Sequence, residues 1–446
     1  MQQAEPSQPV TSAKKVHRAW ALYDWANSAY NLVITSTIFP AYYVAITGDH
    51  ADDTIDYVSF FGWKLSNSVL LEYSLAFAYF IIALLSPILS SIADYRGNKK
   101  QYMKAYCYIG GLACMGLYFF KPGAIELGII CSMLAAIGYC GSLVFYNAYL
   151  PEIAPKEEQD KLSAKGYTYG YIGSVILQLI CFVFIFSGFS DSTFAPRLSF
   201  LLVGVWWIGF AQISFHVLPG RRQQQQNAPR QNIFSNGFRE LQKVWQQAMH
   251  MPRLKTFLGA FFFYSMGVQT VMLAATIFGS KEVKKPVDGK WVNMEAADLI
   301  PAILIIQLVA IAGAMVMARC SRRWGNLSVL CVTVCIWILL CVAAYFTYTN
   351  IEFYLLAVGV GLVMGGIQSL SRSTYSKLLP AGTADTTSFF SLYDVMEKLS
   401  IVLGMFSFGF IEHLFSSMRY SILAIIVFFV VGFILLLLAR RQKVMA

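Results

Sequence analysis

Twelve apolar stretches follow one another along the chain, and each is about long enough to cross a membrane, which takes about 20 residues in a helix. They cover residues 19–46, 68–93, 102–120, 125–150, 167–188, 197–217, 254–279, 297–319, 327–347, 353–378, 388–411 and 419–439. Only 13% of the residues are charged, whereas soluble domains carry about 25%. The sequence therefore predicts an all-α membrane protein with twelve transmembrane helices.

The basic residues are distributed unevenly between the two sides of these helices. With the N-terminus in the cytoplasm, about three quarters of the 34 Lys and Arg residues fall in cytoplasmic segments, as the positive-inside rule requires. This predicts that both termini are cytoplasmic. The net charge of +10 lies in short loops beside the membrane and does not indicate a nucleic-acid partner.

Loop length and glycosylation signals bear on the compartment. The loops are short, and the one Asn-x-Ser/Thr sequence, at Asn326, falls on the predicted cytoplasmic side. These features favour a bacterial cytoplasmic membrane, although a vacuolar protein would look similar.

The order of the apolar stretches divides the chain into two similar halves. We predict a cytoplasmic tail at 1–18, a six-helix bundle at 19–218, a linker at 219–253, a second six-helix bundle at 254–440 and a tail at 441–446. Tyr, Leu and Pro recur at the same spacing in 146–151 and 375–380, at the ends of helices 4 and 10. Parallel repeats of this kind build two-bundle transporters with the substrate site between the halves.

The linker contains a candidate helix. Its second part places five apolar residues on one helical face: Phe234, Phe238, Leu241, Trp245 and Met249. This pattern predicts a helix that lies on the cytoplasmic membrane surface. The alternative is a disordered linker.

The first apolar stretch has a polar face. A helix turns about 100° per residue, so four polar side chains lie on one side of it: Asp24, Asn27, Ser28 and Asn31. A carboxylate in hydrocarbon is costly unless it faces protein or water. We therefore predict that this face lines an internal cavity, with Asn27 and Asn31 binding substrate and Asp24 acting in coupling. The alternative is that Asp24 marks a helix start at the membrane surface, favoured by the helix dipole.

Three ionisable residues lie inside the eleventh stretch. Asp394, Glu397 and Lys398 have the spacing i, i+3, i+4, so they share a face and can pair. We predict a charge network that breaks as the cytoplasmic mouth opens. The alternative is a permanent salt bridge to a neighbouring helix.

Other helices carry polar residues suited to the same cavity. In the tenth stretch, Gln368, Arg372 and Tyr375 share a face, and Arg372 could bind a substrate carboxylate or pair with one of the acidic residues of helices 1 and 11. The predicted substrate-binding residues of helices 4 and 7 are Tyr146, Asn147, Tyr264 and Gln269.

The sequence has no nucleophile motif, no phosphate-binding loop and no metal-ligand spacing. Most of its nine cysteines lie inside apolar stretches, which is typical of small buried residues rather than of a disulfide framework. We expect no cofactor, no metal and no enzymatic activity.

The loop from Ser90 to Lys100, SSIADYRGNKK, resembles the signature between helices 2 and 3 of the major facilitator superfamily. That signature usually starts with Gly and has a basic residue directly after the Asp, where this chain has Ser90 and Tyr95. The resemblance implies that Asp94 locks against the cytoplasmic end of helix 11, with Arg96 in the same network.

Four further stretches resemble the vacuole-effluxer-like family, relatives of the fungal autophagy-related vacuolar amino-acid exporter. They are YDWANSAY at 23–30, FYNAYLPEIAP at 145–155, GVQT at 267–270 and GGIQSLSRS at 365–373. Relatives tend to carry Asn-Asp before GVQT, where this chain has Ser265 and Met266. The resemblance implies a transporter of amino acids or similar metabolites, in which proton coupling rests on Asp24, Asp394 or Glu397, or is absent.

Together these features predict two six-helix bundles of the major facilitator fold that transport a small polar metabolite, amino acids being favoured, by alternating access. We expect a monomer in the lipid bilayer, with a proton as the candidate coupling ion. Two alternatives stay open: an exporter of a lipid-like or cell-wall-derived molecule, and a non-transporting receptor or scaffold.

Overall fold

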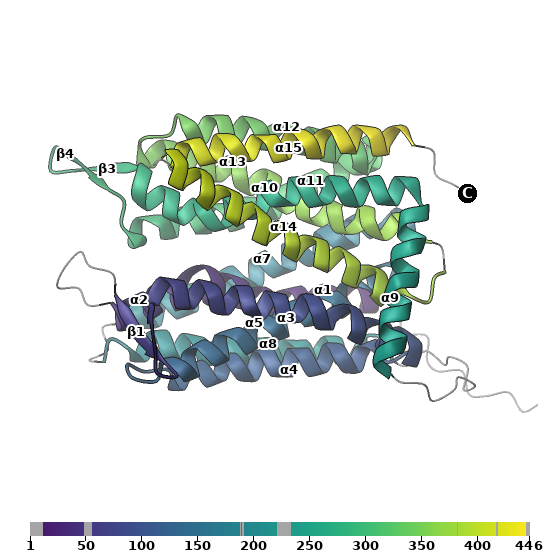
Figure 1. The fold of residues 1–446 in the computed structure, drawn as a ribbon, viewed down its shortest axis with the longest axis horizontal. Helices are drawn as coiled ribbons and strands as arrows, with labels where there is room; N and C mark the ends of the chain where they lie inside the picture. Colours follow the sequence, from purple (N-terminus) through teal and green to yellow (C-terminus); the bar gives the residue numbers. More distant parts are fainter. Residues whose placement is uncertain are drawn as a thin grey trace, which may run out of the picture.

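Twelve long helical segments run side by side along the molecule (Figure 1). The computed structural model describes residues 12–48, 56–187, 189, 191–220, 233–380, 382–415 and 418–442. Eleven of the described helices are long and apolar enough to cross a membrane. The twelfth is α4 (Lys99–Gly116), which is less apolar because Lys99, Lys100 and Lys104 lie in its first turns.

The first six segments form one bundle, and the last six form the other. The N-terminal bundle consists of the continuous segment α1 (Ala13–Ala29), η1 (Tyr30–Thr37) and α2 (Ile38–Thr47), then α3 (Asn67–Arg96), α4, α5 (Ile125–Asn147), α7 (Lys156–Phe186) and α8 (Phe194–Val217). The C-terminal bundle consists of α10 (Pro252–Glu282), α11 (Ala296–Trp324), α12 (Asn326–Tyr345), α13 (Asn350–Leu378), α14 (Thr386–Phe415) and α15 (Met418–Arg441). Two short helices, η2 (Leu117–Phe119) and α6 (Leu150–Ile153), complete the N-terminal half.

The two bundles repeat one packing plan. In the N-terminal bundle, α3 packs on α5, α4 on α5 and α8, and α1 on α7 and α8. The corresponding pairs in the C-terminal bundle also pack: α11 on α13, α12 on α13 and α15, and α10 on α14 and α15. Between the bundles, α7 contacts α11 and α13, and α14 contacts α3 and α5. The predicted fold of two six-helix bundles is confirmed.

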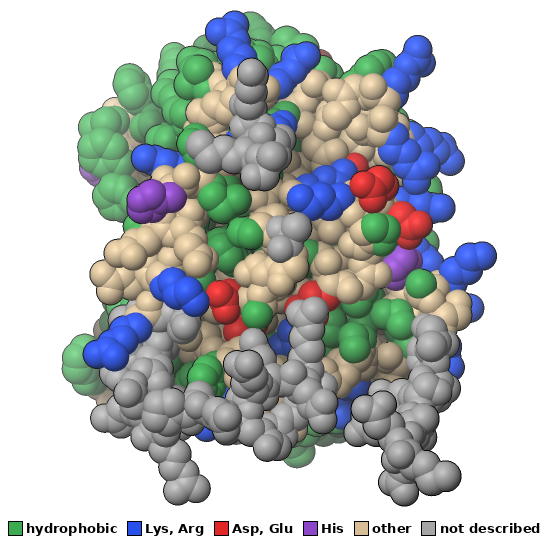
Figure 2. Space-filling view, turned by 90° about the vertical axis from the view of Figure 1, so that its right-hand side faces the viewer, with side chains coloured by type: hydrophobic (Ala, Val, Ile, Leu, Met, Phe, Trp, Pro, Cys, Tyr) green, Lys and Arg blue, Asp and Glu red, His purple; other side chains and the backbone are tan. Residues whose placement is uncertain are grey.

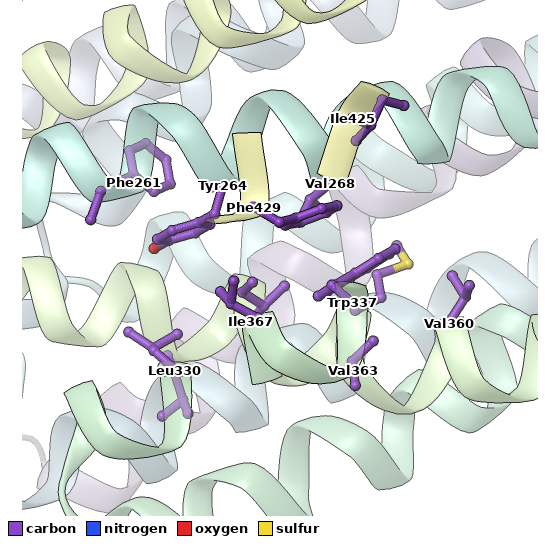
Figure 3. Close-up of a cluster of buried hydrophobic side chains, with 14 of the residues drawn as sticks. Phe261, Tyr264, Val268, Leu330, Trp337, Val360, Val363, Ile367, Ile425 and Phe429 are labelled. Atoms are coloured by element: carbon purple, nitrogen blue, oxygen red, sulfur yellow. The ribbon is translucent and has the colours of Figure 1, made fainter. Parts of the chain in front are cut away.

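Each bundle has its own apolar core. Figure 3 shows part of the C-terminal core, where Trp337 of α12 stacks on Phe429 of α15 with ring centroids 5.7 Å apart. Helices in a membrane gain little from apolar burial alone and need close packing instead. Gly365 of α13 shows this, because a Cβ at that position would collide with the backbone carbonyl of Ala310 in α11.

Two β-hairpins, which the sequence did not lead us to expect, lie at one end of the molecule. β1 (Tyr57–Phe60) pairs with β2 (Trp63–Ser66), and β3 (Lys284–Val287) pairs with β4 (Lys290–Asn293), both antiparallel. Asp288 and Gly289 form the second turn with positive φ angles of 49° and 78°, which suit Asp-Gly in a tight hairpin. We call this end of the molecule the hairpin end.

Helix α9 (Ile233–His250) lies across the opposite end, which we call the α9 end (Figure 1). It contacts α3 of one bundle and α10 and α14 of the other. Val244 and Ala248 are fully buried, whereas Trp245 is exposed. Residues 233–250 therefore form a helix and not the disordered linker that was the alternative. The side chains of Phe234, Phe238 and Leu241 lie outside the described part, so contact of α9 with the membrane stays a prediction.

Candidate site between the two bundles

A buried ion pair joins the two bundles toward the α9 end of the molecule, six residues before the end of α13. Nη1 and Nη2 of Arg372, on α13, lie 3.3 and 3.4 Å from Oδ2 of Asp24, on α1. The hydroxyl of Tyr146, on α5, donates to the same carboxylate oxygen at 2.7 Å. Arg372 and Asp24 are only 2% and 5% exposed. The pair therefore links three helices in a place that bulk water does not reach.

The guanidinium of Arg372 has partners on every side. Its Nε donates to Oγ of Ser163 and its Nη2 to the carbonyl oxygen of Ser163, both at 2.9 Å, and its Nη1 also donates to Oδ1 of Asn147 at 3.2 Å. The rings of Tyr167 and Trp20 lie 4.3 and 4.8 Å from it, within range for cation–π attraction. In this conformation Arg372 pairs with an acidic residue of helix 1, so it is not available to a substrate carboxylate.

Local sequence explains why these groups can meet. The indole of Trp20 stacks on the ring of Tyr146 with centroids 4.4 Å apart and donates to the carbonyl oxygen of Tyr146 at 3.0 Å, which fixes α1 against α5. Gly166 lets α7 approach from the other side, because a Cβ there would lie 2.5 Å from Oδ2 of Asp24. The YDWANSAY and FYNAYLPEIAP stretches also touch directly, through the contacts of Asp24 and Tyr23 with Tyr146.

A second charge cluster lies on α14. Nζ of Lys398 is 3.3 Å from Oδ1 of Asp394 and 3.4 Å from Oε2 of Glu397. Nε2 of Gln269, from the GVQT stretch of α10, donates to Oε1 of Glu397 at 3.3 Å. The three ionisable residues predicted to pair do lie together, within one bundle.

The α9 end of the interface is held by Asp94 of α3. Its carboxylate accepts hydrogen bonds from the backbone N–H groups of Thr387 and Ser388 at 3.1 and 2.7 Å, and from Oγ of Ser388 at 2.8 Å. Those N–H groups begin α14 and have no partner within the helix, so Asp94 caps α14 from the other bundle. Arg96 is exposed and makes no side-chain hydrogen bond or ion pair with the described residues, so the structure does not bring it into this network.

Comparison with known proteins identifies the family to which the chain belongs. The model of the family described as "Vacuole effluxer Atg22 like" matches residues 12–446. The chain belongs to this family. Its relatives include an uncharacterized MFS-type transporter, YxiO of Bacillus subtilis, which is 30% identical over 427 residues covering 95% of this chain and 94% of the relative. Autophagy-related protein 22 of Kluyveromyces lactis is 25% identical, with 94% and 92% covered.

The fold of this Atg22-like chain is also that of solved transporters. A crystal structure of the E. coli fucose:proton symporter FucP aligns with a TM-score of 0.68 at 14% identity, covering 97% of this chain and 99% of that one. The Atg22-like chain is thus a multi-pass membrane transporter of the major facilitator superfamily and not an enzyme.

The Atg22-like chain holds its α9 end together with residues that the sequence had not singled out. Asp160 of α7 binds Nζ of Lys377, on α13, at 2.5 Å and Nδ2 of Asn326, on α12, at 2.7 Å. Glu152 binds Lys99 and accepts from Thr386 at 2.7 Å. The charged stretch 152–165 lies between two of the predicted membrane helices, whereas in the structure α7 begins inside it, at Lys156.

The remaining predicted substrate-binding residues differ in burial and in hydrogen-bond partners in this Atg22-like chain. Gln368 accepts from the hydroxyl of Tyr171 across the bundle interface at 2.9 Å, and Asn31 is exposed. Tyr264 and Tyr375 are buried and bond to Ser371 and to the carbonyl oxygen of Phe389 within the C-terminal bundle. Asn27 is fully buried, and its Nδ2 has no hydrogen-bond partner among the described residues.

Proposed function

We propose that this chain carries amino acids or closely similar metabolites across a bacterial cytoplasmic membrane by alternating access, as a monomer. The observation that carries the proposal is the Arg372–Asp24–Tyr146 network, which joins the two bundles by buried polar contacts. A packed apolar interface would resist separation, whereas a network of polar contacts can exchange its partners for water or substrate.

The distribution of contacts between the bundles supports a closed α9 end. Asp94, Asp160 and Glu152 each reach from the N-terminal half to the C-terminal half near α9. Opening this end requires that these hydrogen bonds and ion pairs break together while each bundle keeps its own core. Rocking of one repeat against the other is the motion that such folds use.

The orientation rests on the basic side chains. Figure 2 shows the α9 end, where Lys and Arg side chains are spread over the face. The positive-inside rule assigns such a face to the cytoplasm. We therefore propose that the α9 end and both termini are cytoplasmic, and that the closed end in this conformation is the cytoplasmic one.

The preference for a polar substrate rests on the side chains that remain accessible near the centre. Asn31, Gln368, Gln269 and Glu397 are exposed or half-buried and come from both bundles. Their amide and carboxylate groups match the ammonium and carboxylate groups of an amino acid. The family resemblance to vacuolar amino-acid exporters points to the same class of substrate.

The test begins with thermal stabilisation of the purified protein by amino acids, dipeptides, nucleosides and sugars, because a ligand of the folded state raises the unfolding midpoint. The stabilising compound is then used for uptake into proteoliposomes. Arg372→Ala should reduce uptake to background, and the exposed Arg323→Ala should retain it. Undiminished uptake by folded Arg372→Ala would contradict the proposal. Stabilisation by amphiphiles alone would favour the exporter of a lipid-like molecule.

A further inference from the structure

The charge cluster of Asp394, Glu397 and Lys398 on α14 has two acidic groups and one basic group. The ammonium group of Lys398 lies 3.3 Å from Oδ1 of Asp394 and 3.4 Å from Oε2 of Glu397, so the two acids share it. Oδ2 of Asp394 is buried and accepts no hydrogen bond from the described residues. The cluster therefore has room for a second cationic group.

Glu397 is the member of the cluster that a small molecule can reach. Its side chain is 28% exposed, against 7% for Asp394 and 8% for Lys398. Its Oε1 accepts a hydrogen bond from the amide of Gln269 at 3.3 Å, which is a neutral partner. Each carboxylate oxygen can accept from more than one donor, so these contacts leave Glu397 able to bind an ammonium or guanidinium group.

The two basic residues beside this region are already used. Arg372 is paired with Asp24 and is only 2% exposed, and Lys398 is shared between two acids. Other titratable groups in electrostatic contact with Glu397 are phenols and a thiol, and none of them is a cation: Tyr79 of α3, Cys140 of α5, Tyr167 of α7, Tyr264 of α10 and Tyr393 of α14. A molecule that enters here meets an accessible acidic group and two basic groups that are enclosed.

Tyrosine rings of the opposite bundle lie close to the same cluster. Tyr79 of α3, Tyr139 of α5 and Tyr167 of α7 are half-buried and in electrostatic contact with it. Two of these rings already lie within range of a cation. The centroid of Tyr79 is 5.9 Å from Nζ of Lys398, and that of Tyr167 is 4.3 Å from Cζ of Arg372. Aromatic rings beside a carboxylate favour the binding of an organic cation.

We propose that Glu397 and the rings of Tyr79, Tyr139 and Tyr167 bind a cationic group of the substrate, and that the chain therefore prefers amino acids with a net positive charge. The side-chain ammonium of lysine or guanidinium of arginine donates to the carboxylate of Glu397. The α-carboxylate is left to neutral groups such as the amide of Gln368. An acidic amino acid adds a further negative charge beside the cluster, which is unfavourable. The inference names a substrate class within the proposed function and rests on it for transport, whereas binding of the cation does not.

The cation site can be tested by isothermal titration calorimetry of the purified protein at neutral pH. Lysine should bind about tenfold more tightly than Nε-acetyl-lysine, which lacks the side-chain charge, and glutamate should bind most weakly. Glu397→Gln should remove this preference, and Glu397→Asp should keep part of it. Glu412→Gln is the matched control, because Glu412 lies on the same helix, is 30% exposed and also pairs with a lysine. Equal affinities for the two ligands in the wild type, or an unchanged preference in Glu397→Gln, would overturn the proposal.

The aromatic part of the site has a separate test. Tyr79→Phe retains a ring and should bind lysine as the wild type does. Tyr79→Leu should bind lysine about threefold more weakly and leave the affinity for Nε-acetyl-lysine unchanged. An equal loss for both ligands in Tyr79→Leu would overturn the role of this ring in attracting the cation.

Uptake into proteoliposomes and binding of cadaverine, a diamine without a carboxylate, separate this inference from the proposed function. If neutral amino acids are transported and lysine has no advantage, the inference fails and the proposed function stands. If no amino acid binds, the proposed function fails. In that case cadaverine binding that Glu397→Gln removes would support the cation site, and absence of cadaverine binding would overturn it as well.

Discussion

At the scale of single residues, the Arg372–Asp24 pair is the contact on which the interface between the two bundles depends. Both side chains are buried, and the guanidinium uses Asn147, Ser163 and two aromatic rings besides the acid. A buried pair of this kind adds little net stability, but removing one partner leaves an uncompensated charge. The pair therefore specifies how the bundles meet more than it strengthens the fold.

This argument predicts a non-additive pattern of stability. Asp24→Asn and Arg372→Gln should each destabilise the protein by about 3–5 kcal/mol, because each leaves its partner buried and unpaired. The double variant should lose clearly less than the sum of the two. Thermal unfolding of the purified variants measures the pattern. Strictly additive losses would show that the two side chains do not interact in the folded protein.

At the scale of elements, Asp94 acts as a removable cap on α14. From the opposite bundle, its carboxylate accepts hydrogen bonds from two backbone N–H groups at the start of that helix. When the bundles separate at the α9 end, water must take its place. The cap thus couples the start of one helix to the conformation of the whole transporter.

Weakening this cap should shift the protein toward opening at the α9 end. Loss of a cap costs about 1 kcal/mol, which changes the closed-to-open ratio about fivefold. Asp94→Ala should therefore speed maleimide labelling of a cysteine placed at the buried interface position Ala164 by a few-fold, in a background without native cysteines. Glu157→Ala, at an exposed position of α7, should not change the rate. Equal labelling in Asp94→Ala would rule out a role for the cap in closing this end.

The sequence predicted the helices well and the contacts between them poorly. Long apolar stretches identify membrane spans, but they do not show charged helix ends, so the fifth predicted stretch begins at 167 and leaves out the first turns of α7, which contain Asp160. Spacing places Arg372 on a helix face without showing which acid lies opposite. That choice depends on how α1 and α13 meet across the bundle interface, which no local pattern encodes. A polar side chain on the predicted face can also be used for a hydrogen bond within its own bundle, as Tyr375 is. A shared face alone therefore does not identify a substrate-binding residue.

Helix 1 shows a further feature that sequence spacing did not predict. The stretch Tyr30–Thr37 is a π-helix, in which the hydroxyls of Ser36 and Thr37 donate to carbonyls five residues earlier, on Asn31 and Leu32, at 2.9 and 2.8 Å. Pro40 follows and has no N–H to donate to the carbonyl of Ser36. The wide turn shifts the register of the helix beyond it, so the spacing of 100° per residue does not extend past this turn. π-helical turns are frequent at functional sites.

At the scale of the whole molecule, the two repeats close the α9 end by equivalent means. A residue near the α3–α4 connection, Asp94, holds the start of α14. Residues near the α11–α12 connection, Ser321 and Asn326, hold Asp160 in the second turn of α7. Because α14 and α7 occupy equivalent places in their bundles, the two contacts are related by the repeat. A pseudo-twofold pair of contacts allows both sides of the interface to release in one motion.

If transport requires this end to open, a covalent link across it should stop the cycle. Ala164 of α7 packs with Ala314 and Ala318 of α11 in a small cluster between the bundles. In a background without the nine native cysteines, cysteines at Ala164 and Ala318 joined by a short thiol cross-linker that reductant cleaves should reduce uptake to background. Cleavage should restore uptake, and each single-cysteine variant should be unaffected by the reagent. Full uptake by completely cross-linked protein would mean that the α9 end stays closed throughout the cycle and that alternating access does not operate here.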